Sequence, residues 1–405
     1  MDPKLRAQAD DLNVESWMTD LLLKALHLKR RYPLTPFVNF LGTHFDSPTV
    51  HIQAERAAIL TTALCAFKAD LVAGRLEPDF LRTKANCGHS LSWLFNAVRE
   101  LNVDKMIKYP GNEYVAVLRK GHLFKVPLEH AGTTVSYDLL KATYQAFVDL
   151  DLKERSWAGM LTTDNRDAWG LIIITANGRS ATIFEHYMTD LTTVSQLSQR
   201  LQNAINTLDL GNTAASDGAI AIDSASLKLI PLVTTEDIES RIETLRYDYL
   251  AITSTKQYVP HLINSFGKTL LPSHSVPIKA TFDLTIQLAS RLYFGYLPAK
   301  LGDRIDGTRV MAQDQKDEEI PELFSDPVWK RGYPELIMQT MVETKPAEDS
   351  GFTMPHPESV WMIYTVFDDS VEVCFVSPTK SADRFIAALD RAEDLVKDII
   401  SERVI

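Results

Sequence analysis

The sequence predicts an α/β protein with two similar lobes, because one pattern of elements occurs twice. A β-branched strand, a tight turn, a returning strand and an amphipathic helix follow one another over residues 171–208 and again over residues 360–399. Each lobe should therefore hold a mixed sheet flanked by helices, and a site between the lobes is expected because pockets often form at such interfaces. We place one lobe at residues 35–233 and the other at residues 1–34 together with 234–405.

The first copy of the pattern opens with Leu171–Thr175 and returns over Ser180–Phe184. Asn177-Gly178 between them is the dipeptide that a two-residue type I′ turn favours. A helix is then predicted from Asp190, a common N-cap residue. Its apolar face should carry Val194, Leu197, Leu201, Ile205 and Leu208.

The second copy has strands at residues 360–366 and 371–376 around a turn at residues 368–370. The helix after it should bury Phe385, Leu389, Ala392, Val396 and Ile399. Between the copies, periodicity and punctuation by Gly and Pro predict further elements. They are helices at 17–28, 55–72 (stopped by Gly74), 137–148, from 234 and at 282–293, a hairpin at 114–126, and loops at 211–226 and 313–319.

Composition limits the classes of function. The net charge of −11 and the isoelectric point near 5.4 argue against a nucleic-acid partner, which would need a basic face. The chain has no apolar stretch long enough to span a membrane, and its first residues lack an apolar signal core, so we expect a cytoplasmic protein. Cys65, Cys87 and Cys374 stand singly, without metal-ligand spacing or a disulfide pattern, so no metal site is predicted.

His186 is the candidate catalytic base, because it follows a buried strand at the point where the chain turns towards a helix. The sheet would hold the imidazole there while the next loop leaves space for a substrate. Glu185 and Asp190 bracket it, and a carboxylate near a histidine can fix the tautomer and favour the protonated form. The alternatives are a histidine that only fills the strand end and an Asp190 that only caps the helix.

Several blocks, in a shared order, resemble the choline/carnitine O-acyltransferase family from about Trp17 to the C-terminus. In character they are closest to the carnitine-acyltransferase-like domains of fungal reducing polyketide synthases. The blocks are residues 53–58 (QAERAA), 76–80 (LEPDF), 161–169 (LTTDNRDAW), 177–190 around Glu185-His186, 266–268 (FGK) and 324–329 (FSDPVW).

The resemblance implies two chloramphenicol-acetyltransferase-like lobes around a tunnel, and acyl transfer in a ternary complex without a covalent enzyme intermediate. His186 would take the proton of an acceptor hydroxyl as it attacks a thioester and return it to the departing thiolate. Thr340 falls where the family has the last serine of its Ser-Thr-Ser triplet and would donate to the oxyanion; the alternative is an ordinary strand residue. Tyr296, Arg309 and Glu185 are predicted to bind substrate.

Departures from the family pattern change the expected substrates. Lys268 is kept, but Pro272 and Ser275 stand where the family places further lysines for coenzyme A. The stretch between residues 309 and 324 is short and omits the block with the carnitine-carboxylate arginine, and a second shortening lies between residues 169 and 171. A wider tunnel should result, which suits a bulky acyl group or a donor on a carrier protein, and carnitine is not expected as acceptor.

We therefore predict an O-acyltransferase that moves an acyl group, a polyketide, from a thioester on a phosphopantetheine carrier protein or CoA to an alcohol or amine. No bound cofactor and a monomeric state are expected. Three alternatives stay open: a thioester hydrolase or a cyclase or rearrangement catalyst on the same fold, a CoA-dependent carnitine-type acyltransferase, and a non-catalytic scaffold.

Overall fold

The structure is a computed structural model that divides the chain into two compact units. The histidine unit comprises residues 33–252 and 345–350, and the C-terminal unit comprises residues 1–32, 253–344 and 351–405. The lobe boundaries given above stay a prediction. The structure describes residues 7, 10, 39–78, 80–81, 84–85, 88–100, 105–109, 113–130, 133–152, 170–184, 186, 189, 191–208, 227–231, 233–264, 267–269, 277–294, 337–341, 350–351, 359–378 and 381–402.

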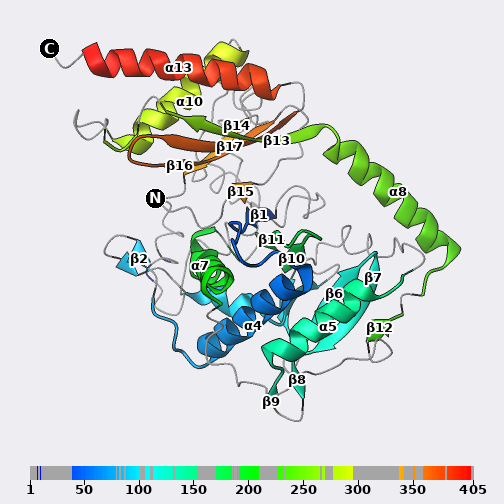
Figure 1. Ribbon diagram of the computed structural model, residues 1–405. Coiled ribbons are helices and arrows are strands. Elements are labelled where there is room, and N and C mark those ends of the chain that lie inside the picture. Colours follow the sequence, from blue (N-terminus) through cyan, green and yellow to red (C-terminus); the bar gives the residue numbers. More distant parts are fainter. Residues whose placement is uncertain are drawn as a thin grey trace. The chain divides into compact units, whose positions relative to one another are not determined.

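The main sheet of the histidine unit has the strand order β10-β11-β1-β15 (Figure 1). Its strands are β10 (Gly170–Ile174), β11 (Ser180–Phe184), β1 (Phe40–Thr43) and β15 (Ser350–Gly351). Strand β11 pairs antiparallel with both β10 and β1. The predicted hairpin is therefore confirmed.

Two helices of this unit, α4 (Gln53–Val72) and α7 (Leu191–Thr207), follow their predicted spans closely and pack against each other. Helix α4 ends at Val72, and Gly74, whose φ is 66°, follows its C-cap. Hydrogen bonds from Arg75 N to Asp70 O and from Gly74 N to Leu71 O satisfy the last carbonyls. Residues on α7 that were predicted to be buried are buried: Val194, Leu197, Leu201 and Ile205. Leu208 was predicted wrongly, because it lies past the helix end with φ of 56° and is 50% exposed.

The turn between β10 and β11 differs from the predicted two-residue type I′ turn. Thr175 N donates to Arg179 O, and Gly178 N donates to Thr175 O, so the loop holds three residues. Gly178 has φ of 78°, whereas Asn177 is absent from the positive-φ residues of the described chain. The turn is thus the three-residue kind that places glycine in the left-handed region.

Gly178 gives a stability prediction with a matched control. An added Cβ would lie 2.5 Å from the backbone carbon of His51, whereas at Gly74, which also has positive φ, nothing lies within 4 Å. Gly74→Ala should cost about 1 kcal/mol from backbone strain alone, and Gly178→Ala about 2 kcal/mol or more. Urea unfolding of both variants measures the difference, and equal losses would contradict the close approach.

A second sheet of the histidine unit has the order β12-β7-β6. It comprises β6 (Tyr114–Arg119), β7 (His122–Pro127) and β12 (Lys228–Ile230). Lys120 and Gly121 both have positive φ, as a two-residue type I′ hairpin needs. One face of β7, with Phe124 and Val126, packs against α4 and α5 (Tyr137–Asp149). The unit also contains β2 (Phe80–Leu81), β3 (Lys84–Ala85), η2 (His89–Trp93), β4 (Ala97–Glu100), β5 (Lys105–Lys108), β8 (Glu129–His130), β9 (Thr133–Thr134) and most of α8 (Glu236–Thr253).

The C-terminal unit has one four-stranded sheet with the order β13-β17-β16-β14. Its strands are β13 (Lys256–Ile263), β14 (Ile337–Met341), β16 (Val360–Val366) and β17 (Val371–Pro378). Helices α10 (Ile278–Phe294) and α13 (Ala382–Glu402) cover one face, and their apolar side chains share a core with those of β16 and β17. Ile399 was predicted to be buried but is 55% exposed, and Ile400 is buried in its place because the apolar face advances by one residue over the helix.

The two units share a repeated arrangement. Strands β10-β11-β1 of one sheet correspond in order and direction to β16-β17-β13 of the other. Helix α7 follows the β10–β11 hairpin and α4 follows β1. In the same way, α13 follows the β16–β17 hairpin and α10 follows β13. The predicted α/β fold class is therefore confirmed.

Two further properties concern only the described part of the chain. Its helices do not combine the length and apolar character that crossing a membrane requires. Its His, Cys, Asp and Glu side chains form no group of three or more that could hold a metal ion.

Candidate functional site

His186 lies two residues beyond β11 and is half-buried. Its ring meets the ring of Phe40 in an edge contact, with centroids 5.1 Å apart and planes at 74°. Phe40 in turn stacks on Phe184 at 5.4 Å, and these two residues are direct partners across β1 and β11. The imidazole thus rests on an aromatic pair fixed by strand register, at the end of the strand where the sequence places it.

The other predicted site residues are placed only in part. Thr340 lies in β14, opposite Ile363 of the parallel strand β16. Glu185, Asp190, Tyr296 and Arg309 lie outside the described residues. Their assigned roles, and that of Thr340, therefore stay predictions. The sequence did not point to Phe40, because its place beside His186 depends on the pairing of β1 with β11.

A second histidine, His44, contacts the same hairpin, although no sequence pattern pointed to it. Its Nδ1 lies 2.8 Å from Ser180 Oγ and its Nε2 lies 3.0 Å from Thr182 Oγ1. Its backbone N–H also donates to Ser180 O. Ser180 and Thr182 place two hydroxyl groups in a strand that is predicted to be buried. They were the available signal for a polar partner such as His44, because buried hydroxyls need hydrogen-bond partners.

Burial is the main cause that lowers the pKa of His44 to about 4, and the charge of Arg56 lowers it further. The ring is therefore neutral at physiological pH, with one nitrogen donating and the other accepting. A neutral imidazole with both nitrogens engaged is a structural clamp between β1 and β11. It keeps Phe40 in register with Phe184, and so supports the contact made by His186.

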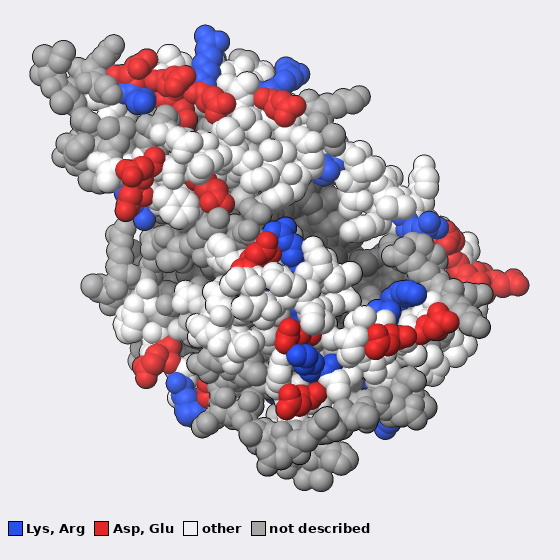
Figure 2. Space-filling view, viewed as in Figure 1, with Lys and Arg blue, Asp and Glu red and all other residues white. Residues whose placement is uncertain are grey.

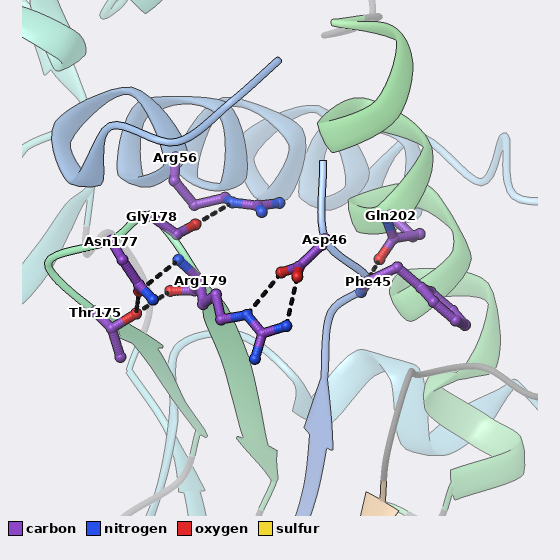
Figure 3. Close-up of polar contacts among 8 residues, drawn as sticks. All are labelled: Phe45, Asp46, Arg56, Thr175, Asn177, Gly178, Arg179 and Gln202. Atoms are coloured by element: carbon purple, nitrogen blue, oxygen red, sulfur yellow. Dashed lines mark hydrogen bonds and ion pairs between the residues drawn. The ribbon is translucent and has the colours of Figure 1, made fainter. Parts of the chain in front are cut away.

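Side chains of α4 hold the turn of the β10–β11 hairpin in place (Figure 3). Arg56, which is 1% exposed, donates from Nε to Gly178 O at 2.7 Å, and Gln53 Nε2 donates to Ile174 O at 2.8 Å. Burial lowers the pKa of the Arg56 guanidinium, and the charge of Asp46 partly counters that effect. On the surface, Asp46 forms an ion pair with Arg179. Two elements, β1 and α4, thereby hold the hairpin whose far end carries His186.

Comparison with known proteins connects this chain to an enzyme family. The family model described as "Choline/Carnitine o-acyltransferase" matches residues 1–172 and 170–301. "Highly reducing polyketide synthase ltbA" of Aspergillus luteorubrus is 48% identical over 527 residues, covering 98% of this chain and 16% of that protein. "Carnitine O-acetyltransferase, mitochondrial" of Saccharomyces cerevisiae is 22% identical over 381 residues, covering 74% of this chain and 55% of that protein.

A solved structure, "Wax ester synthase/diacylglycerol acyltransferase from Marinobacter aquaeolei VT8", covers 95% of this chain and 98% of its own, at 10% identity and a TM-score of 0.34. The chain spans only 16% of the length of the ltbA synthase. The 527 aligned residues exceed the 405 of this chain, so that relative has stretches which this chain lacks. The two family matches meet at residues 170–172, close to the shortening predicted between residues 169 and 171.

Proposed function

The chain belongs to the choline/carnitine O-acyltransferase family, and we propose that it transfers an acyl group from a thioester to an alcohol or amine with His186 as general base. The acyl group is a polyketide chain and the donor is a carrier protein. The observation that carries the proposal is the half-buried imidazole of His186, set against Phe40 at the end of β11. A histidine held this way has a defined orientation, and the exposed part of its ring can face a reactant.

In the proposed reaction, His186 takes one proton from the acceptor and later gives it to the leaving thiolate. The acceptor O–H or N–H gives its proton to a ring nitrogen of His186 while its oxygen or nitrogen attacks the thioester carbon. The negative charge that forms on the carbonyl oxygen is stabilised by a hydroxyl, for which Thr340 is the proposed donor. Collapse of the intermediate breaks the carbon–sulfur bond, and the imidazolium returns the proton to the thiolate.

The surroundings of Lys268 support a carrier protein over CoA as donor. Lys268 is exposed and its backbone N–H donates to Phe367 O. The next residue, Thr269, bonds to Asp368 O and to the Asp369 carboxylate, so this lysine adjoins a turn with two acidic residues. One cation beside two anions is a weak site for a nucleotide phosphate. The homologous ltbA synthase agrees with a donor in polyketide synthesis.

The test follows the acyl group by intact-protein mass spectrometry. An acyl-loaded carrier protein is incubated with the enzyme, with and without candidate alcohols and amines. Loss of the acyl group only when an acceptor is present, with the matching ester or amide formed, is the expected result. Loss without acceptor would indicate hydrolysis or cyclisation instead, and unchanged loading in every mixture would reject acyl transfer.

Phe40 offers a milder prediction about the same site. Phe40→Leu keeps an apolar side chain but removes the ring edge that meets His186. Aromatic contacts of this kind are worth about 0.5–1.5 kcal/mol, so the rate of transfer should fall by roughly up to tenfold. Single-turnover kinetics measure the chemical step. A variant as fast as wild type would show that Phe40 does not orient the imidazole.

A further inference from the structure

The outer face of the sheet β12-β7-β6 combines basic and apolar side chains. Lys125 and Lys228 are direct cross-strand partners, and both are exposed. Beside them, Leu118 and Leu123 are partners across β6 and β7, and Leu118 is 49% exposed. The opposite face of β6 and β7 is covered, since its residues Val115, Val117, Phe124 and Val126 pack on α4 and α5 (Figure 1). We call the exposed side the lysine face; it consists of Tyr114, Ala116, Leu118, Leu123, Lys125, Pro127, Lys228 and Ile230.

The charge of the lysine face is opposite to that of the whole chain. The chain has 53 acidic and 42 basic residues, yet the lysine face carries Lys125 and Lys228 and no acidic residue. Figure 2 shows acidic side chains over α13 and at the start of α8, in contrast. A local positive surface on an acidic protein is a means of steering an anionic partner.

The lysine pair is not explained by the stability of the sheet. Like charges placed directly opposite each other on a sheet destabilise it. Lysines also protect exposed sheet edges from pairing with other strands, which accounts for Lys228 on β12 but not for Lys125 on the central strand β7. Lys125 Nζ lies 4.1 Å from the centre of the Tyr114 ring, a contact that offsets part of the repulsion. Within the described residues, neither lysine forms an ion pair.

We infer that the lysine face is the docking surface for the acidic acyl carrier protein that delivers the donor thioester. The inference rests on the proposed function and adds the place where the donor binds. Lys125 and Lys228 would meet carboxylates of the carrier, while Leu118, Leu123 and Ile230 would contact its apolar residues. A mixed basic and apolar surface fits a partner that must bind, react and leave, because charge speeds the encounter without requiring a large apolar contact.

The test separates docking from chemistry by comparing two donors with the same acyl group. One is a fungal acyl carrier protein loaded through phosphopantetheine, and the other is the acyl thioester of N-acetylcysteamine, which has no protein to dock. The double variant K125E/K228E should raise KM for the carrier-protein donor about tenfold or more, and leave kcat/KM for the small thioester unchanged. Higher salt should weaken carrier binding to wild type and affect the double variant little.

A matched control is K108E/K397E, which makes the same change of net charge at two other exposed lysines. This control should leave KM for the carrier protein near the wild-type value. An equal effect of both double variants, or no effect of K125E/K228E, would overturn the inference. The neutral variant K125Q/K228Q gives a second measurement if the charge-reversed protein is unstable, and it should lie between wild type and K125E/K228E.

Direct binding keeps the inference separate from the proposed function. Fluorescence anisotropy of a labelled holo-carrier protein reports docking even if no acyl group is transferred, so activity with neither donor would reject the function and leave the docking result standing. The last part of the binding experiment uses vesicles of anionic phospholipid in place of the carrier protein. Binding to these vesicles that depends on Lys125 and Lys228, without binding of the carrier protein, would overturn the inference in favour of a membrane surface.

Discussion

His186→Ala is expected to lower the single-turnover rate of acyl transfer by a factor of roughly 10²–10⁴, the usual contribution of a positioned general base. The loss should appear in kcat more than in KM, because the imidazole acts on the proton in the transition state and does not hold the acyl chain. The free energy of unfolding should change by less than about 1 kcal/mol, since the side chain is only half-buried.

The matched control for this prediction is His51→Ala. His51 belongs to the same unit, its side chain is exposed, and its ring contacts only the carbonyl of Pro48 among the hydrogen bonds described. Its loss should leave the rate near the wild-type value. Retained transfer in His186→Ala, with product formed at a tenth or more of the wild-type rate, would exclude His186 as the base and favour the structural role for this residue.

The architecture of this protein could be predicted from sequence because it depends on short-range patterns. Hydrophobic periodicity located both copies of the hairpin and helix, and Gly74 marked the end of α4. The errors occurred at element ends. At Asn177-Gly178 the turn type depended on Arg56 and the backbone of His51, which approach the turn from α4 and from the segment before it. Such long-range contacts leave no periodic signal.

Only those residues of the candidate site that are next to a predicted strand in the sequence could be predicted. His186 follows directly from the end of β11, so its position could be derived from the strand. Phe40 and His44 meet β11 from more than a hundred residues away, and only the pairing of β1 with β11 brings them there. Their roles depend on a register that alternation within one strand cannot determine.

Acid should destabilise this protein through His44. Its pKa is near 6.5 in the unfolded chain and about 4 in the folded protein. Above pH 6.5 the imidazole is neutral in both states and contributes no pH dependence. Between pH 6.5 and pH 4 the unfolded chain binds a proton that the folded protein does not, so the free energy of unfolding falls as the pH falls. The slope reaches about 1.4 kcal/mol per pH unit, and the total is about 3 kcal/mol.

His44→Gln isolates this contribution from that of other titrating groups. Glutamine can donate and accept but cannot titrate, so the variant should be less stable at pH 7, by about 1–3 kcal/mol for imperfect bonds to Ser180 and Thr182. The difference between wild type and variant should then shrink towards pH 4. Urea unfolding at half-unit steps of pH measures that difference. A constant difference across this range would show that the His44 ring takes up its proton at the same pH in the folded protein as in the unfolded chain, and that a neutral ring is not needed to hold β1 to β11.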